Sequence, residues 1–66
     1  MILVNDRDQI EWEEGMTVAW LLKKCGFTAS QIHVLVNGEL VRREAFDTRP
    51  IRDGDQVKVI HFLGGG

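Results

Sequence analysis

The stretch TVAWLLKKCGF, residues 17–27, decides how this chain folds. Thr17 stands where a helix N-cap belongs, because its hydroxyl can accept a hydrogen bond from an otherwise unpaired backbone N–H. Four apolar side chains follow at positions i, i+3, i+4 and i+7 and form one stripe on a helix: Val18, Leu21, Leu22 and Cys25. Gly26 suits the left-handed position after a helix, and Phe27 can then fold back onto the helix end. We therefore predict one amphipathic helix from Val18 to Cys25.

Two short segments before this helix are predicted to form a β-hairpin. Ile2–Val4 is an apolar run, and the polar cluster at residues 5–8 favours a turn because Asn and Asp side chains cap local backbone groups. Gln9–Glu13 then alternates polar and apolar residues, which is the period of a half-buried strand. We expect strands over both segments.

A second hairpin is predicted after the helix. His33–Val36 has the composition of a strand, and Asn37-Gly38 is the strongest short-range signal for a type I′ turn. Glu39–Val41 is the expected returning strand. The segment from Arg42 to Arg49 shows no clear period, and Phe46 is its expected buried anchor.

The last strand is predicted over Val57–Phe62, after the tight turn Asp53-Gly54-Asp55. Pro50 lacks an N–H and limits any strand around it to an edge or an end. The predicted order is therefore β-β-α-β-β-β, an α+β fold with the helix packed on one face of the sheet.

Composition and charge restrict the function further. A chain of 66 residues with 44% hydrophobic residues fills one small core, which leaves little room for an enclosed substrate cleft. The net charge of −2 provides no basic field for nucleic acid or for an anionic membrane. The apolar runs Val18–Leu22 and Val57–Leu63 are far shorter than a membrane span. Cys25 alone cannot form an intrachain disulfide and is expected to be a small core residue. We expect a cytoplasmic protein.

Four motifs in this order resemble the ThiS family, the sulfur carriers of thiamine (thiazole) biosynthesis within the ThiS/MoaD ubiquitin-like β-grasp group. They are TVAWLL at residues 17–22, VNGE at 36–39, DGD at 53–55 and VIHFLGGG at 59–66. The resemblance implies a mixed sheet of four to five strands packed on one helix. It also implies a β-grasp domain over residues 1–63 and a flexible glycine tail over residues 64–66.

The resemblance implies chemistry at the glycine tail. An E1-like adenylating enzyme of the ThiF type would use ATP to adenylate the Gly66 carboxylate, and sulfur from a cysteine-derived persulfide would displace AMP. The resulting Gly66 thiocarboxylate would donate sulfur to a thiazole synthase of the ThiG type. The chain would then be a monomeric cosubstrate, not an enzyme, with no cofactor of its own. Because glycine lacks a Cβ, Gly64 and Gly65 can thread a narrow channel.

Partner docking is predicted on the strand that leads into the tail. Side chains alternate faces along a strand, so Val57 and Val59 are expected to face the helix. The residues expected on the opposite face or beside the tail then form a docking surface: Lys58, Ile60, Phe62 and Leu63. The reverse assignment, with Ile60 and Phe62 buried, remains open at this point.

Other readings of the sequence remain. The chain could carry sulfur for molybdopterin or another pathway, act as a ubiquitin-like modifier that joins Gly66 to a lysine, or be a β-grasp binding module without tail chemistry. His33 and His61 lie in different predicted strands and have no metal-ligand spacing with other residues. Asp53 and Asp55 are expected to shape a turn and not to bind calcium.

Overall fold

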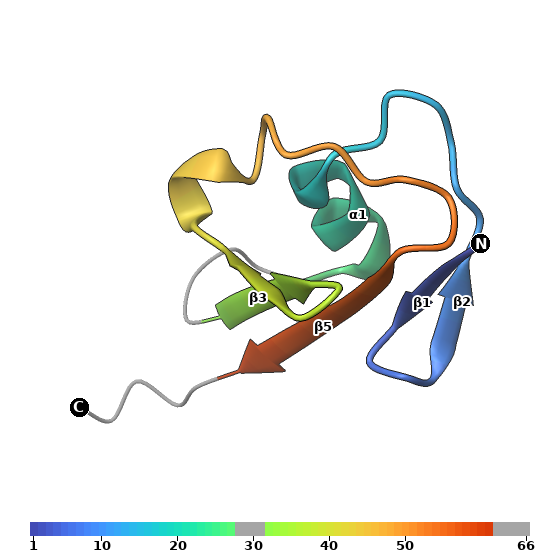
Figure 1. Cartoon of the computed structure of the whole chain (residues 1–66), viewed down its shortest axis with the longest axis horizontal. Coiled ribbons are helices and arrows are strands. Elements are labelled where there is room, and N and C mark those ends of the chain that lie inside the picture. Colours follow the sequence, from blue (N-terminus) through green and yellow to red (C-terminus); the bar gives the residue numbers. More distant parts are fainter. Residues whose placement is uncertain (28–31, 62–66) are drawn as a thin grey trace.

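The computed structural model describes residues 1–27 and 32–61. The elements of this described part follow in chain order (Figure 1): β1 (Ile2–Val4), β2 (Asp8–Ile10), α1 (Val18–Cys25), β3 (Ile32–Val36), β4 (Glu39–Val41), the 3-10 turn η1 (Arg43–Ala45) and β5 (Gln56–His61). This confirms the predicted order of strands and helix.

Helix α1 has the predicted bounds because both of its ends are capped. The Thr17 hydroxyl accepts a hydrogen bond from the Trp20 N–H at 3.2 Å. At the other end, Gly26 is left-handed with φ 81°, and its N–H donates to the Lys23 carbonyl. The Phe27 N–H donates to the Leu22 carbonyl at 2.9 Å. These two bonds form a Schellman motif, which satisfies carbonyls that the helix leaves unpaired.

The strands form one mixed sheet in the order β2-β1-β5-β3-β4, and α1 lies across one face of it (Figure 1). The pair β1–β5 is parallel, and the other three pairs are antiparallel. The late strand β5 therefore lies between the first hairpin and the second and joins them into one sheet.

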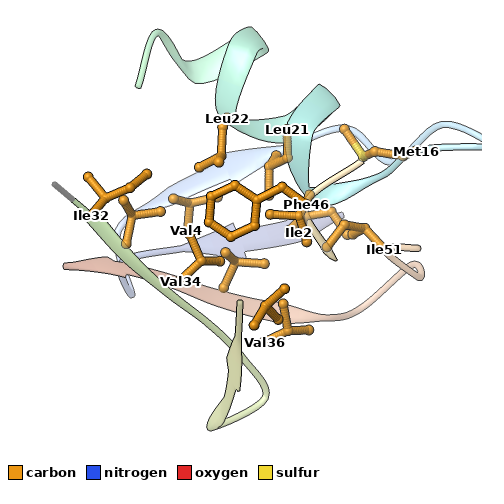
Figure 2. Close-up of a cluster of buried hydrophobic side chains, with 14 residues drawn as sticks. Ile2, Val4, Met16, Leu21, Leu22, Ile32, Val34, Val36, Phe46 and Ile51 are labelled. Carbon is orange, nitrogen blue, oxygen red and sulfur yellow. The ribbon is translucent and has the colours of Figure 1, made fainter. Parts of the chain in front are cut away.

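The core lies between α1 and the sheet (Figure 2). Val18, Leu21 and Leu22 from the helix are at most 3% exposed, as the apolar stripe predicted. The sheet and the segments around it contribute further buried side chains: Ile2, Val4, Met16, Ile32, Val34, Val36, Val41, Phe46, Ile51, Val57 and Val59. Phe46 is the predicted anchor of its segment, and it packs in the same cluster.

The prediction of a strand over Gln9–Glu13 is wrong in its bounds. Strand β2 covers Asp8–Ile10, and its pairing with β1 ends at Ile2↔Ile10. Since Ile2 is the first residue of β1, that strand offers no partners to the residues after Ile10. The alternation continues past the ladder because Trp12 is still partly buried against the core, and its indole N–H donates to the Ile51 carbonyl at 2.7 Å.

The two predicted turns of the second half are present. Asn37 and Gly38 have φ of 52° and 84°, the paired positive values of a type I′ turn. In the turn before β5, the Asp55 carboxylate accepts hydrogen bonds from the Asn37 side chain and from the Arg52 N–H. Asp53 forms an ion pair with the Met1 amino group. Both aspartates therefore have structural partners.

Candidate functional site

Strand β5 presents two different faces. Val57 and Val59 point into the core and are 1% and 7% exposed. Lys58 is exposed, and Ile60 is 49% exposed on the opposite face. This confirms the predicted orientation for the described residues, and it excludes the reverse assignment for Ile60. The face of the sheet away from α1 is called the outer face below.

Two leucines from the second hairpin share the outer face with β5. The register places Leu35 of β3 opposite both Lys58 of β5 and Leu40 of β4. Leu35 is partly exposed, and Leu40 is 54% exposed. Leu35, Leu40, Lys58 and Ile60 together form what we call the outer patch. Apolar side chains gathered in this way on one face are typical of a protein–protein contact.

Leu35 and Leu40 were not among the docking residues predicted from the sequence. A signal for them existed, because a two-residue turn at Asn37-Gly38 fixes the hairpin register so that Val36 faces Glu39. The next pair is then Leu35↔Leu40, and it must lie on the face opposite Val34.

Charged groups lie around the outer patch. The Lys58 ammonium lies 3.3 Å from the Asp6 carboxylate, and both side chains are more than half exposed. Such a pair contributes little to stability, since water screens it. The ion pair nevertheless holds the Lys58 side chain toward the β1–β2 turn. On the other side of β5, His33 of β3 is the cross-strand neighbour of Ile60.

His61, the last described residue of β5, has a second contact besides its pairing with Ile32. Its ring lies against Phe27, with 5.5 Å between the ring centroids and 47° between the planes. Phe27 is fixed by the Schellman motif at the end of α1. The point from which the chain continues toward the glycines is therefore anchored to both the sheet and the helix. Phe62, Leu63, Gly64, Gly65 and Gly66, which the sequence analysis assigned to docking and tail chemistry, lie outside the described residues.

Cys25 behaves as a small core residue, as predicted. It packs against the core from the apolar stripe of α1. Burial raises the pKa of its thiol, the Asp8 carboxylate raises it further, and Lys24 opposes them. A raised pKa reduces the fraction of reactive thiolate at neutral pH.

The described part of the chain contains no group of three or more His, Cys, Asp or Glu side chains that could hold a metal ion. None of its helices is long and apolar enough to span a membrane. A hollow of about 450 Å³ lies between α1 and η1, and its described lining includes Leu22, Phe27, Phe46 and the charged Lys23 and Asp47. This hollow lies on the helix side of the sheet and is separate from the outer patch.

Comparison with known proteins agrees with this geometry. The sequence model of the ThiS family matches residues 1–66. The chain belongs to the ThiS family. A crystal structure of the thiamine biosynthesis protein ThiS from Geobacter metallireducens matches with a TM-score of 0.80 and 34% identity, over 98% of this chain and 97% of that one. A solution structure of a thiamine biosynthesis protein from the same organism matches with a TM-score of 0.77 and 36% identity, over 98% and 86%. The fold is the ubiquitin-like β-grasp expected for this family.

Curated relatives are of two sizes. The sulfur carrier protein ThiS of Thermus thermophilus is 36% identical over 80% of this chain and 83% of its own length. Two larger relatives are named thiazole synthase, one from Magnetococcus marinus with 35% identity over 82% of this chain, and one from Paramagnetospirillum magneticum with 30% identity over 100%. This ThiS-family chain spans only 17% and 20% of their lengths.

Proposed function

We propose that this ThiS-family chain is a sulfur carrier whose Gly66 carboxylate becomes a thiocarboxylate that supplies sulfur for thiazole formation in thiamine biosynthesis. The observation that carries the proposal is the outer patch, because it includes Lys58 and Ile60 of β5, and only Phe62 and Leu63 separate this strand from Gly64-Gly65-Gly66 in the sequence. A partner bound at this patch would hold the glycines at a fixed distance from its own active site. The relative named sulfur carrier protein ThiS supports the assignment.

The proposed chemistry has three steps. The Gly66 carboxylate attacks the α-phosphate of ATP in an E1-like adenylating enzyme, and pyrophosphate leaves. A cysteine-derived persulfide then attacks the acyl carbonyl and expels AMP. A second thiol attacks the cysteine sulfur of the resulting acyl disulfide, forms a new disulfide with that cysteine and releases the thiocarboxylate. Activation is needed because a carboxylate is a poor acceptor for a nucleophile, whereas an acyl-adenylate has a good leaving group. The carrier supplies the reacting group and is consumed and regenerated as a cosubstrate.

The glycines fit this role for a physical reason. Three residues without Cβ atoms can enter a narrow channel in any backbone conformation, and they give about 10 Å of reach when extended. The carbonyl of Gly66 is also free of side-chain bulk, so a nucleophile can approach it. Gly64 and Gly65 are therefore proposed to thread the partner's channel.

A thiazole synthase is the proposed acceptor of the sulfur. Segments similar to this chain lie within two proteins that are named thiazole synthase. When two domains are joined in one polypeptide, each has a high effective concentration for the other. Such a fusion therefore favours domains that bind one another. The same outer patch would then bind the adenylating enzyme and the synthase in turn.

Adenylation can be tested by ATP–pyrophosphate exchange with the E1-like enzyme of the same organism. The parent chain is expected to support exchange, and deletion of Gly66 is expected to abolish it while the melting temperature stays unchanged. Normal exchange by the Gly66-deleted chain would show that the activated group lies elsewhere. A ubiquitin-like modifier would share this adenylation step, and the intact mass of the chain purified from its own cells separates the two functions.

A further inference from the structure

Strand β5 is a central strand over its first half and an edge strand over its second half. Strand β3 pairs with it from Val36↔Val57 to Ile32↔His61. Strand β1 pairs with it only at Leu3↔Gln56 and Val4↔Val57. Beyond these pairs, the side of β5 that faces away from β3 has no neighbouring strand in the described part of the chain.

Asn5 ends the β1–β5 ladder in a specific way. Its backbone N–H still donates to the Val57 carbonyl at 2.8 Å. Its φ of 55° then turns the chain away from β5. In place of the backbone carbonyl that a continuing strand would supply, the Asn5 side-chain oxygen accepts the Val59 N–H at 2.7 Å. The ladder is therefore extended by one side-chain bond and stops there.

The next two groups on this edge have no partner in the part of the chain that the structure describes. Backbone groups alternate sides along a strand, so the Val59 carbonyl and the His61 N–H point the same way as the Val59 N–H, away from β3. Neither group has a hydrogen-bond partner within residues 1–27 and 32–61. One acceptor and one donor thus stand side by side next to the start of the glycine tail.

A parallel strand is the partner that could use both of these groups through a single residue. In a parallel pair, a single residue donates its N–H to one carbonyl of its neighbour and accepts the N–H two residues further on. A residue placed opposite Ile60 would make both bonds, to Val59 and to His61. An antiparallel partner centred on Val59 would need the Val59 N–H, which Asn5 already occupies.

We propose that this open edge of β5, from Val59 to His61, takes up an extended segment of the thiazole synthase by parallel β-strand addition. The inference rests on the proposed function, because it specifies how that partner holds the carrier. Main-chain bonds of this kind give affinity, and side-chain contacts give specificity. The partner residue opposite Ile60 would lie beside it on the outer face, so we expect an apolar side chain there, continuous with the outer patch.

This edge is open to such a partner in the described structure. Edges that must stay unpaired are commonly protected by proline, by charges that point inward, or by a bulge. Val59, Ile60 and His61 include no proline and no acidic or lysine side chain, and they pair with β3 without a bulge. The charged pair Lys58–Asp6 lies one residue before the open groups.

The test compares two substitutions at one position. His61→Pro removes the free N–H and leaves the β3 pairing possible, because this N–H does not face β3. His61→Ala keeps the N–H and controls for loss of the ring contact with Phe27. Binding of each chain to the purified thiazole synthase of the same organism is measured by calorimetry. We expect His61→Ala to bind within about twofold of the parent and His61→Pro to bind at least about tenfold more weakly.

Amide hydrogen exchange gives a second, independent result. In the parent chain, the His61 amide is expected to exchange fast when free and slowly when the synthase is bound. If the melting temperature of His61→Pro is well below that of His61→Ala, the binding experiment uses a synthetic chain in which an ester stands in place of the His61 amide. The ester removes the N–H and keeps the path of the backbone. Equal binding by the ester chain and the parent, or an unprotected His61 amide in the complex, would overturn the inference while the carrier function stands. If the parent itself does not bind the synthase, both the proposed partner and the inference fail, whereas adenylation of Gly66 is unaffected.

Discussion

Ile60→Asp is the substitution that tests the outer patch most sharply. Ile60 is 49% exposed, so a partner can cover about half of its side chain. Full burial of an isoleucine contributes about 1.5–3 kcal/mol, so the remaining half is worth about 0.7–1.5 kcal/mol in a complex. The new carboxylate must also lose water when a partner covers it, which adds to the loss. We therefore expect binding to the adenylating enzyme to weaken by more than about tenfold, equivalent to about 1.4 kcal/mol.

The neighbouring residue provides the matched control. Val59 lies one position earlier on the same strand, is 7% exposed and faces the core. Val59→Asp should unfold the domain, because it buries a charge without a partner. Ile60→Asp should melt close to the parent. Thermal melting by circular dichroism and binding by calorimetry separate the two effects. Parental affinity of a folded Ile60→Asp chain, or its unfolding, would refute the placement of the docking surface on this face.

Three further substitutions and one chemical reaction test the fold. Leu21→Ala should lower the free energy of unfolding by about 2–5 kcal/mol, because Leu21 is 1% exposed in the core. Trp20→Ala on the same helix should cost far less, since Trp20 is 39% exposed, and equal losses in urea titrations would show that the helix stripe is misplaced. Trp12→Phe should cost about 1–3 kcal/mol by leaving the Ile51 carbonyl without its indole donor, and an unchanged denaturation midpoint would contradict the role of that bond. Alkylation of Cys25 by iodoacetamide at neutral pH should be slower than that of the unfolded chain, and the midpoint of its rate against pH should lie higher, because the raised pKa leaves less thiolate at any given pH. Equal rates for the folded and unfolded chains would show that burial does not protect the thiol.

Elements with local signals at both ends could be predicted from the sequence. The bounds of α1 follow from Thr17 and Gly26, since each satisfies backbone groups that the helix leaves unpaired. The second hairpin follows from Asn37 and Gly38, whose positive φ values few other residue pairs adopt. The alternation of Val57, Lys58, Val59 and Ile60 also settles which face each occupies once the helix side is known.

Features that depend on distant partners could not be predicted in the same way. The end of β2 at Ile10 is set by the length of β1, which the alternation through Trp12 does not reveal. The 3-10 turn η1 has no period of its own, and it forms where the chain brings Phe46 into the core. The open edge of β5 depends on Asn5, which lies more than fifty residues away in sequence and ends the ladder with its side chain.

The intact mass of the chain purified from its own cells tests the central claim most directly. A sulfur carrier predicts a population of molecules heavier by the difference between one sulfur and one oxygen atom, with the change located at Gly66 by fragmentation. This population should disappear when the adenylating enzyme is deleted. Isopeptide adducts between Gly66 and lysines of other proteins, with no thiocarboxylate in cells that are making thiamine, would contradict the account and favour a protein modifier.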